Sequence, residues 1–209
     1  MIRIGILGDI GSGKSFIAKN FGYPVFNADD EVSKLYRKNK KIFIKLKKNL
    51  PKHFQSFPID KKEVSSAILY NKKNLKKIIK IVHLEIRKKM YIFEKKNKNK
   101  KIIVLDIPLL IENKINKKKD ILIFVQSKRS DILKRLKKRV NFNRKLISMF
   151  KSIQLPLDYK KKNSQFVINN NFTKLKIKKN ISSILKEILQ NEWNYFRYRN
   201  YWPVSKRGP

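Results

Sequence analysis

The sequence predicts an α/β fold with a mostly parallel β-sheet, and two observations carry the prediction. Short apolar runs such as IIVLDIPLLI and ILIFV alternate with longer segments whose apolar residues recur every three or four positions, a spacing typical of amphipathic helices. The apolar runs are nearly continuous, as in strands that helices cover on both faces. With 209 residues, 41% of them hydrophobic, the chain is long enough for one sizeable core.

The first half of the chain is predicted to contain two strands and a long helical region. Residues 2–7 (IRIGIL) form the first strand, and residues 15–21 (SFIAKNF) form a helix that opens at a glycine-rich loop. Residues 24–30 (PVFNADD) form a second short strand that ends in acids. Residues 31–98 place apolar side chains at spacings of three and four, so we expect them to be mainly helical.

The second half is predicted to add three strands. They lie within residues 101–113 (KIIVLDIPLLIEN), 120–127 (DILIFVQS) and 164–170 (SQFVINN). Residues 130–139 form a helix for which Ser130 is a candidate N-cap. Residues 140–163 form a basic helical excursion that Pro156 breaks.

The composition excludes several classes of protein. The chain has no cysteine, which excludes disulfides, thiolate catalysis and cysteine metal sites, and its two histidines cannot build a histidine-rich metal site alone. No apolar stretch reaches the length of a membrane span, and the N-terminus lacks the features of a signal peptide. We therefore expect a cytoplasmic protein that does not contact a membrane.

The net charge of +38, from 53 Lys and Arg against 15 Asp and Glu, is compatible with two explanations. A basic surface is typical of proteins that bind nucleic acid. The lysines, however, are mixed with Asn and Ile along the whole chain, a bias that an A+T-rich coding sequence would also produce. Residues 1–31 escape the excess, since they hold three basic and four acidic side chains.

The clearest motif is GDIGSGKS, residues 8–15, which fits the phosphate-binding loop pattern G-x-x-x-x-G-K-[ST] between a predicted strand and a predicted helix. Small residues let backbone N–H groups approach phosphates, and the helix N-terminus adds its positive end. Lys14 supplies a cation for the β- and γ-phosphates, and Ser15 a hydroxyl for Mg²⁺. The predicted ATP-binding residues of this segment are Gly8, Gly11, Ser12, Gly13, Lys14, Ser15 and Phe16.

Acidic residues at strand ends narrow the chemistry further. Asp29 is predicted to end the second strand, at the sheet edge that faces a nucleotide, where its carboxylate could accept a proton from an acceptor hydroxyl. Asp30 and Glu31 are expected to begin the next helix as structural residues. Asp106 ends a buried strand at the same edge, and either orders Mg²⁺ through water or caps the turn before Pro108.

Five segments, taken in order, resemble the dephospho-coenzyme A kinase family over residues 2–171: GDIGSGKSFIAKNFGYPVFNADD, IVHLEIRKKM, VLDIPLLIEN, DILIFVQSKRSDILKRLKKR and QLPLDYKKKNSQFVINN. DIPLLIEN and LPLDYKKKNSQFVINN are the most specific pieces. The resemblance implies transfer of the γ-phosphoryl group of ATP to the ribose 3′-hydroxyl of dephospho-coenzyme A, the last step of coenzyme A synthesis, with Mg²⁺ and with Asp29 as the base. The implied partners are therefore ATP and dephospho-coenzyme A.

The resemblance also implies a three-layer αβα P-loop fold of the nucleoside-monophosphate-kinase kind, in a single domain with three parts. These parts are a core of residues 1–30, 99–135 and 164–190, a helical substrate-binding insertion at 31–98 and a lid at 136–163, and a tail follows at 191–209. The tail lies outside the resemblance, and its alternating aromatic and basic residues have no functional account. A monomer or a weak homo-oligomer is expected.

Two departures from the family pattern concern the acceptor side. The first acid of the family's DAD motif is Asn27, which weakens a metal or ribose role there but leaves Asp29 in place. The usual HP dipeptide is His83-Leu84, followed by Arg87. His83 and Arg87, four residues apart on one helix face, are therefore either substrate-binding residues or a polar edge of a packed helix.

Three departures concern the nucleotide side. Asp9 stands where the family has a second glycine, and its negative charge near the phosphates predicts weaker nucleotide binding. Phe16 replaces a hydroxyl residue. Phe150 replaces a lid arginine, for which Lys151, Arg144 or Arg139 could substitute, although a lysine lacks the two-pronged contact of arginine. Arg139 is the lid cation that we expect to close over ATP.

Two alternatives stay open from the sequence. The first is another P-loop kinase that acts on a nucleotide or nucleoside. The second is a basic nucleic-acid-binding P-loop protein, which the net charge suggests, although the chain lacks the guanine-reading N-K-x-D motif and any recognised DNA- or RNA-binding motif. No specific nucleic acid partner is therefore expected.

Overall fold

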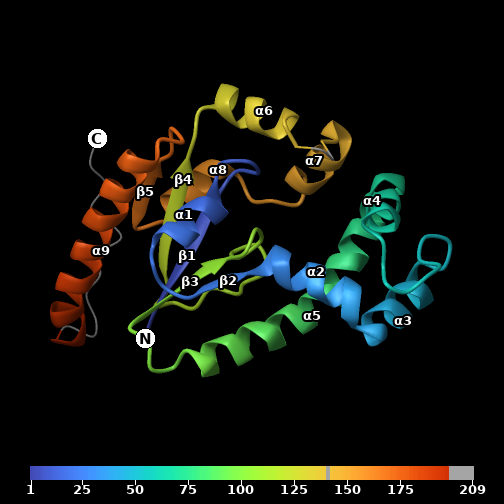
Figure 1. The fold of residues 1–209 in the computed structure, drawn as a ribbon, viewed down its shortest axis with the longest axis horizontal. Helices are drawn as coiled ribbons and strands as arrows, with labels where there is room; N and C mark the ends of the chain where they lie inside the picture. Colours follow the sequence, from blue (N-terminus) through green and yellow to red (C-terminus); the bar gives the residue numbers. More distant parts are fainter. Residues whose placement is uncertain (140–141, 198–209) are drawn as a thin grey trace.

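The computed structural model describes residues 1–139 and 142–197, in which five parallel strands form one sheet in the order β2-β3-β1-β4-β5 (Figure 1). The strands are β1 (Ile2–Gly8), β2 (Val25–Asn27), β3 (Ile102–Asp106), β4 (Ile121–Gln126) and β5 (Phe166–Asn169). The helices are α1 (Lys14–Asn20), α2 (Ala28–Lys38), α3 (Lys40–Asn49), α4 (Lys61–Tyr70), α5 (Lys72–Lys96), α6 (Arg129–Lys137), α7 (Arg144–Lys151), α8 (Leu157–Lys162) and α9 (Lys174–Arg197). All four strand pairings are parallel, which confirms the predicted sheet type.

Helices cover both faces of the sheet, as the nearly continuous apolar strands predict. On one face, Ile4 and Val104 pack in an apolar cluster with residues of α1 and α9. On the other face, Ile103 and Leu105 pack in a second cluster with residues of α2, α3, α4 and α5. Successive residues of β3 therefore enter opposite clusters, because side chains alternate across a strand. Figure 1 shows α9 on one side of the sheet and the α2–α5 group on the other.

Two predicted boundaries are wrong: the end of the second strand and the N-cap of the helix that follows β4. The second strand ends at Asn27, and Asp29 lies in the first turn of α2, because the Asn27 side chain accepts a hydrogen bond from the Asp30 amide at 2.9 Å and starts the helix there. Ser130 is not an N-cap. Helix α6 begins at Arg129, and its first amides donate to the main-chain carbonyl of Lys128 without a side-chain cap.

The basic excursion before β5 is helical, as predicted, and Pro156 separates its two helices at the N-cap position of α8. Of the predicted tail, residues 191–197 continue α9, and residues 198–209 lie outside the described residues. Within the part of the chain that the structure describes, no helix has both the length and the apolar content needed to cross a membrane.

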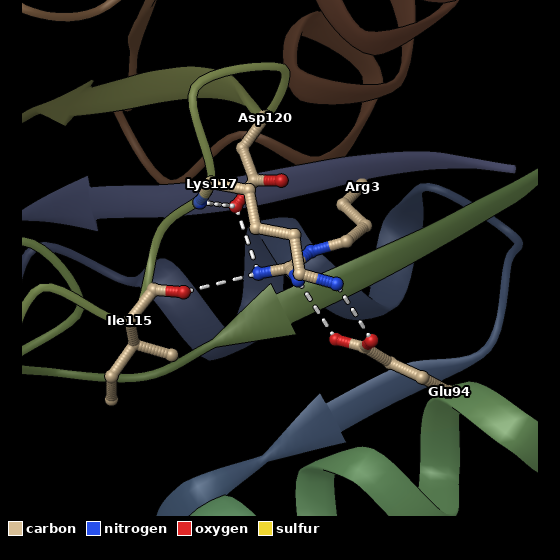
Figure 2. A network of polar contacts seen from close by, with 5 residues as sticks. All are labelled: Arg3, Glu94, Ile115, Lys117 and Asp120. Atoms are coloured by element: carbon tan, nitrogen blue, oxygen red, sulfur yellow. Dashed lines mark hydrogen bonds and ion pairs between the residues drawn. The ribbon is translucent and has the colours of Figure 1, made fainter.

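A buried ionic network lies at the N-terminal end of β1 (Figure 2). Arg3 is only 5% exposed and forms ion pairs of 2.9 Å with Glu94 of α5 and with Asp120, which precedes β4. The same guanidinium donates to the main-chain carbonyl of Ile115 at 3.3 Å. Lys117 adds an ion pair to Glu94 at 3.1 Å and a backbone amide to Asp120 at 2.8 Å. The network ties α5 to the sheet at the end opposite the glycine-rich loop.

Candidate active site

The glycine-rich loop runs from the end of β1 to the start of α1. Gly13 occupies the N-cap position of α1 in a left-handed conformation, with φ of 92°. A side chain at this position would be strained, and its Cβ would collide with the side-chain amide of Asn170. Gly11 also has a positive φ, 87°. The glycines identified from the sequence are therefore required by the backbone path between β1 and α1.

Residues that follow β4 and β5 hold this loop in place. The buried residue Ser12 presents its main-chain carbonyl to two donors, the Asn170 side-chain amide at 2.7 Å and the Ser127 hydroxyl at 3.0 Å. Asn170 directly follows β5, and Ser127 directly follows β4. The sequence interpretation missed both residues, and their only signal is a polar side chain at the carboxyl end of a predicted strand.

Lys14 opens α1 and turns back toward the loop. Its ammonium group donates hydrogen bonds to the main-chain carbonyls of Gly8 at 3.2 Å and Asp9 at 2.8 Å. Burial lowers the pKa of Lys14 to about 8, the negative charge of Asp106 opposes this change, and the positive charge of Lys160 adds to it. The lysine therefore has main-chain oxygens as hydrogen-bond partners and carboxylates as neighbouring charges.

Asp106 ends β3 and is 3% exposed. It lies opposite Asn27 in the register of β2 and β3, and the Asn27 side-chain amide donates to its Oδ2 atom at 2.7 Å. Burial raises the pKa of Asp106, while a hydrogen bond from Ser15 and the positive charge of Lys14 counteract the rise. Asn27 thus joins two elements of the site, since it caps α2 with one side-chain atom and contacts Asp106 with another.

Asp29 lies in the first turn of α2, within the electrostatic influence of the same groups. Limited hydration raises its pKa, and the neighbouring carboxylate of Asp106 adds to the rise. The positive charges of Lys14 and Arg139 lower the pKa of Asp29. The structure therefore brings three of the predicted site residues, Lys14, Asp29 and Asp106, together at the carboxyl edge of the sheet, and the charge of Arg139 acts on one of them, Asp29.

His83 and Arg87 lie on α5, apart from this cluster. Arg87 donates to the main-chain carbonyl of Asn113 at 2.7 Å, at the end of the DIPLLIEN segment. Burial and the adjacent Arg87 charge lower the pKa of His83. No hydrogen bond or ion pair in residues 1–139 and 142–190 joins this pair to the P-loop residues.

The segments on either side of Pro156 connect to the core through a buried ion pair. Lys160 of α8 is 1% exposed and pairs with Glu112 at 2.6 Å. The same carboxylate accepts the Leu155 amide at 3.1 Å, and Lys160 also approaches the Gln154 side-chain oxygen at 3.4 Å. The two segments most specific to the family resemblance, DIPLLIEN and LPLDYKKKNSQFVINN, are thereby joined to each other. Nothing in the lysine-rich sequence marks Lys160 as buried.

The three cations that could substitute for the missing arginine, Arg139, Arg144 and Lys151, occupy different positions. The ring of Phe150 packs against the apolar cluster beneath α7. Lys151, the next residue, forms an ion pair of 2.8 Å with Asp9 of the glycine-rich loop. Arg139 and Arg144 are both exposed, but only the charge of Arg139 acts on Asp29, and Arg144 lies at the start of α7. Lys151 and Arg139 are thus the two cations that approach the cluster.

A magnesium ion carried by a nucleotide fits the residues at this edge of the sheet. No group of three or more acidic or histidine side chains that could hold a metal occurs among the described residues. Mg²⁺ on a nucleotide needs fewer protein groups, because phosphates and waters supply the remaining oxygens. The Ser15 hydroxyl and the buried Asp106 carboxylate, whose pKa the Ser15 side chain lowers, offer such a pair of groups. Phe16, the next residue of α1, is 37% exposed.

Comparisons with known proteins extend over nearly the whole chain. The family model described as dephospho-CoA kinase matches residues 2–175. A dephospho-CoA kinase of Wolbachia sp. subsp. Brugia malayi is 35% identical over 190 residues, 88% of this chain and 97% of the relative. A dephospho-CoA kinase of Bacillus thuringiensis is 33% identical over 204 residues, 92% of this chain and 98% of the relative.

Solved structures show the same fold. A crystal structure of a Thermus thermophilus protein has a TM-score of 0.71 at 26% identity and covers 91% of this chain and 97% of its own. A dephospho-CoA kinase from Campylobacter jejuni has a TM-score of 0.60 at 20% identity, over 91% of this chain and 98% of its own. The resemblance inferred from the motifs is confirmed by the family match.

Proposed function

The chain belongs to the dephospho-CoA kinase family, whose reaction is the last step of coenzyme A biosynthesis, and from this premise we propose how its own residues carry out the transfer. In the proposed reaction the γ-phosphoryl group of ATP moves in line to the ribose 3′-hydroxyl of dephospho-CoA. Because such transfers depend mainly on positioning and charge neutralisation, the residues that matter are those that hold phosphates and orient the hydroxyl.

The glycine-rich loop and Lys14 bind the triphosphate. The main-chain amides of residues 8–15 and the N-terminus of α1 supply donors, and Lys14 supplies the cation. Lys14 reaches the phosphates by leaving the carbonyls of Gly8 and Asp9, which exchanges two neutral acceptors for charged ones. Arg139 closes over ATP from the lid, which we assign to residues 136–163.

Asp29 accepts the proton of the acceptor hydroxyl. Its raised pKa supports this role, since a general base works best when its pKa approaches the working pH. The positive charges of Lys14 and Arg139 keep the carboxylate ionised enough to act as a base. Ser15, and Asp106 through water, would hold Mg²⁺ on the nucleotide, and the metal would supply neutralisation of phosphate charge.

The acceptor binds over the helical insertion, residues 31–98. We assign His83 and Arg87 to its recognition, because α5 presents both on the side where Arg87 already contacts the DIPLLIEN segment. The single observation that carries the whole proposal is the clustering of Lys14, Asp29 and Asp106 at the carboxyl edge of the sheet. The nucleic-acid alternative gains no support from the described site.

A coupled ADP-release assay of the purified protein tests the proposal. We expect release that depends on dephospho-CoA and that nucleoside monophosphates do not replace. The Lys14→Ala variant is the control for contaminating kinases, because loss of its cation should lower turnover at least about a hundredfold. Equal ADP release with nucleoside monophosphates would favour the other P-loop kinases instead.

A further inference from the structure

Asp9 of the glycine-rich loop contacts two lysines, Lys14 and Lys151. Its main-chain carbonyl accepts from Lys14 at 2.8 Å, and its Oδ2 atom pairs with Lys151 of α7 at 2.8 Å. The other carboxylate oxygen accepts the Ile10 amide at 2.7 Å, which fixes the orientation of the side chain. One residue of the loop therefore holds the P-loop lysine through its backbone and a lid lysine through its side chain.

The Asp9–Lys151 pair joins segments that are 142 residues apart in the chain, so it holds the end of α7 beside the glycine-rich loop. Among the ion pairs of the described residues, Asp9–Lys151 is the one that joins the glycine-rich loop to α7. Phe150, the residue before Lys151, packs against the apolar cluster, while Lys151 pairs with the loop. The Lys151 side chain is 47% exposed, so the pair is only partly shielded from water.

We propose that Lys151 is a phosphate-binding residue of the lid and that Asp9 holds it beside the loop until the triphosphate of ATP takes the place of the Asp9 carboxylate. The inference rests on the proposed function, since it assigns the nucleotide to the loop. A half-exposed pair of single charges is weak. Phosphate oxygens carry more negative charge than one carboxylate and accept stronger hydrogen bonds, so the exchange favours the nucleotide.

Asp9 then has two opposing effects. It keeps a lid cation close to the site, and it competes with the nucleotide for that cation. This competition distinguishes the proposal from a permanent clasp, in which the pair persists when ATP is bound. If the pair were a permanent clasp, both residues would favour ATP binding. If the triphosphate replaces the Asp9 carboxylate, Lys151 favours ATP binding and Asp9 opposes it.

The test measures binding of Mg²⁺-ATP by calorimetry without acceptor, for Lys151→Ala, Asp9→Asn and the double variant. We expect Lys151→Ala to weaken binding about tenfold, the range of one charge-assisted hydrogen bond. Asp9→Asn should tighten binding about threefold, and this gain should shrink in the Lys151→Ala background. Lys151→Arg should bind at least as tightly as the unaltered protein.

Lys145→Ala is the matched control, because Lys145 is an exposed lysine of the same helix. Its loss should change the dissociation constant less than twofold. The proposal is overturned if Asp9→Asn weakens binding, which indicates a clasp, or if Lys151→Ala behaves like Lys145→Ala. Turnover with dephospho-CoA is measured separately. The two variants Lys151→Ala and Asp9→Asn could change ATP affinity in opposite directions while the protein releases no ADP in response to dephospho-CoA. That result would support this inference and reject the proposed function.

Discussion

At the start of β1 the Arg3 guanidinium lies between two carboxylates at 2.9 Å, whereas just beyond the end of the same strand Lys14 donates to main-chain carbonyls. At the first end, two cations face two anions in a closed network (Figure 2). Burial raises the pKa of Asp120 there, but the Lys117 amide and the Arg3 charge counteract the rise. At the second end, the pKa of Lys14 is lowered and the pKa values of Asp29 and Asp106 are raised. Unfavourable charged states are typical of functional sites.

The charges of the Arg3 network stabilise the fold, whereas the fold holds the carboxyl group of Asp29 where its ionised form is disfavoured. Removing one member of the Arg3 network leaves the others buried and uncompensated. Removing the Asp29 carboxylate relieves a cost that burial and the neighbouring Asp106 charge impose on its ionised form. Substitutions of Arg3 and of Asp29 should therefore affect stability in opposite directions.

Arg3→Ala carries the largest expected effect on stability. It strands Glu94 and Asp120 without their shared cation, so we expect the free energy of unfolding to fall by about 3–5 kcal/mol. Lys88→Ala is the control, because its ion pair with Glu85 is exposed and should cost less than about 1 kcal/mol. Urea denaturation measures both. Equal losses would mean that the Arg3 network is not what holds this end of the sheet.

Asn27→Asp should have an intermediate effect. The new carboxylate can still cap α2 but cannot donate to Asp106 and instead faces it as a like charge, so stability should fall by about 1–3 kcal/mol. Asn39→Asp is the matched control, because Asn39 caps α3 in the same way, accepting from the Ile42 amide at 3.1 Å. Its change should be close to zero in the same denaturation experiment. If Asn27→Asp cost no more than this control, the bond to Asp106 would contribute nothing.

The pH dependence of nucleotide binding tests Lys14. Its pKa in the folded protein, about 8, lies below the ordinary value of 10.5, so without nucleotide the folded protein loses this proton at a lower pH than the unfolded chain does. Phosphates favour the protonated lysine. Below pH 8 binding should be flat with respect to this group, and above pH 8 the dissociation constant for ATP should rise by up to about tenfold per pH unit.

Lys14→Arg is the control for that titration, since arginine stays protonated in this range and should remove the slope whatever its own affinity. Calorimetry in buffers of different ionisation enthalpy would also detect the proton taken up on binding. A dissociation constant that stays constant for the unaltered protein up to pH 9.5 would contradict the lowered pKa.

The sequence predicted the strands and most helices because their signal is local. Continuous apolar runs and three-to-four spacing depend only on neighbouring residues, and the parallel sheet follows from their alternation. The local errors arose at caps. Asn27 begins α2 before the acids, which moves Asp29 from a strand end to a helical turn, and a main-chain carbonyl serves at Lys128 where a hydroxyl at Ser130 was expected.

The residues of the glycine-rich loop and Asp106 were also predictable. The loop carries a recognisable motif directly after a strand, and Asp106 ends an apolar run that is itself a strand. The contacts of Lys151, Lys160 and Asn170 were not predictable. Each joins segments that are distant in the chain, and the sequence offers 53 Lys and Arg residues with no pattern that singles out a buried or a paired one. Such pairs depend on tertiary packing, which places α7 and α8 beside the loop and the DIPLLIEN turn.

The role of Asp29 as the base is tested by the Asp29→Asn variant, with turnover and urea unfolding measured on the same preparation at neutral pH. Because the pKa of Asp29 is raised in the folded protein, its ionised form costs stability above that pKa, and the neutral amide removes the cost. We therefore expect kcat to fall about 10²- to 10⁴-fold while the free energy of unfolding stays level or rises. Near-normal turnover, or a loss of stability like that of Arg3→Ala, would contradict the account.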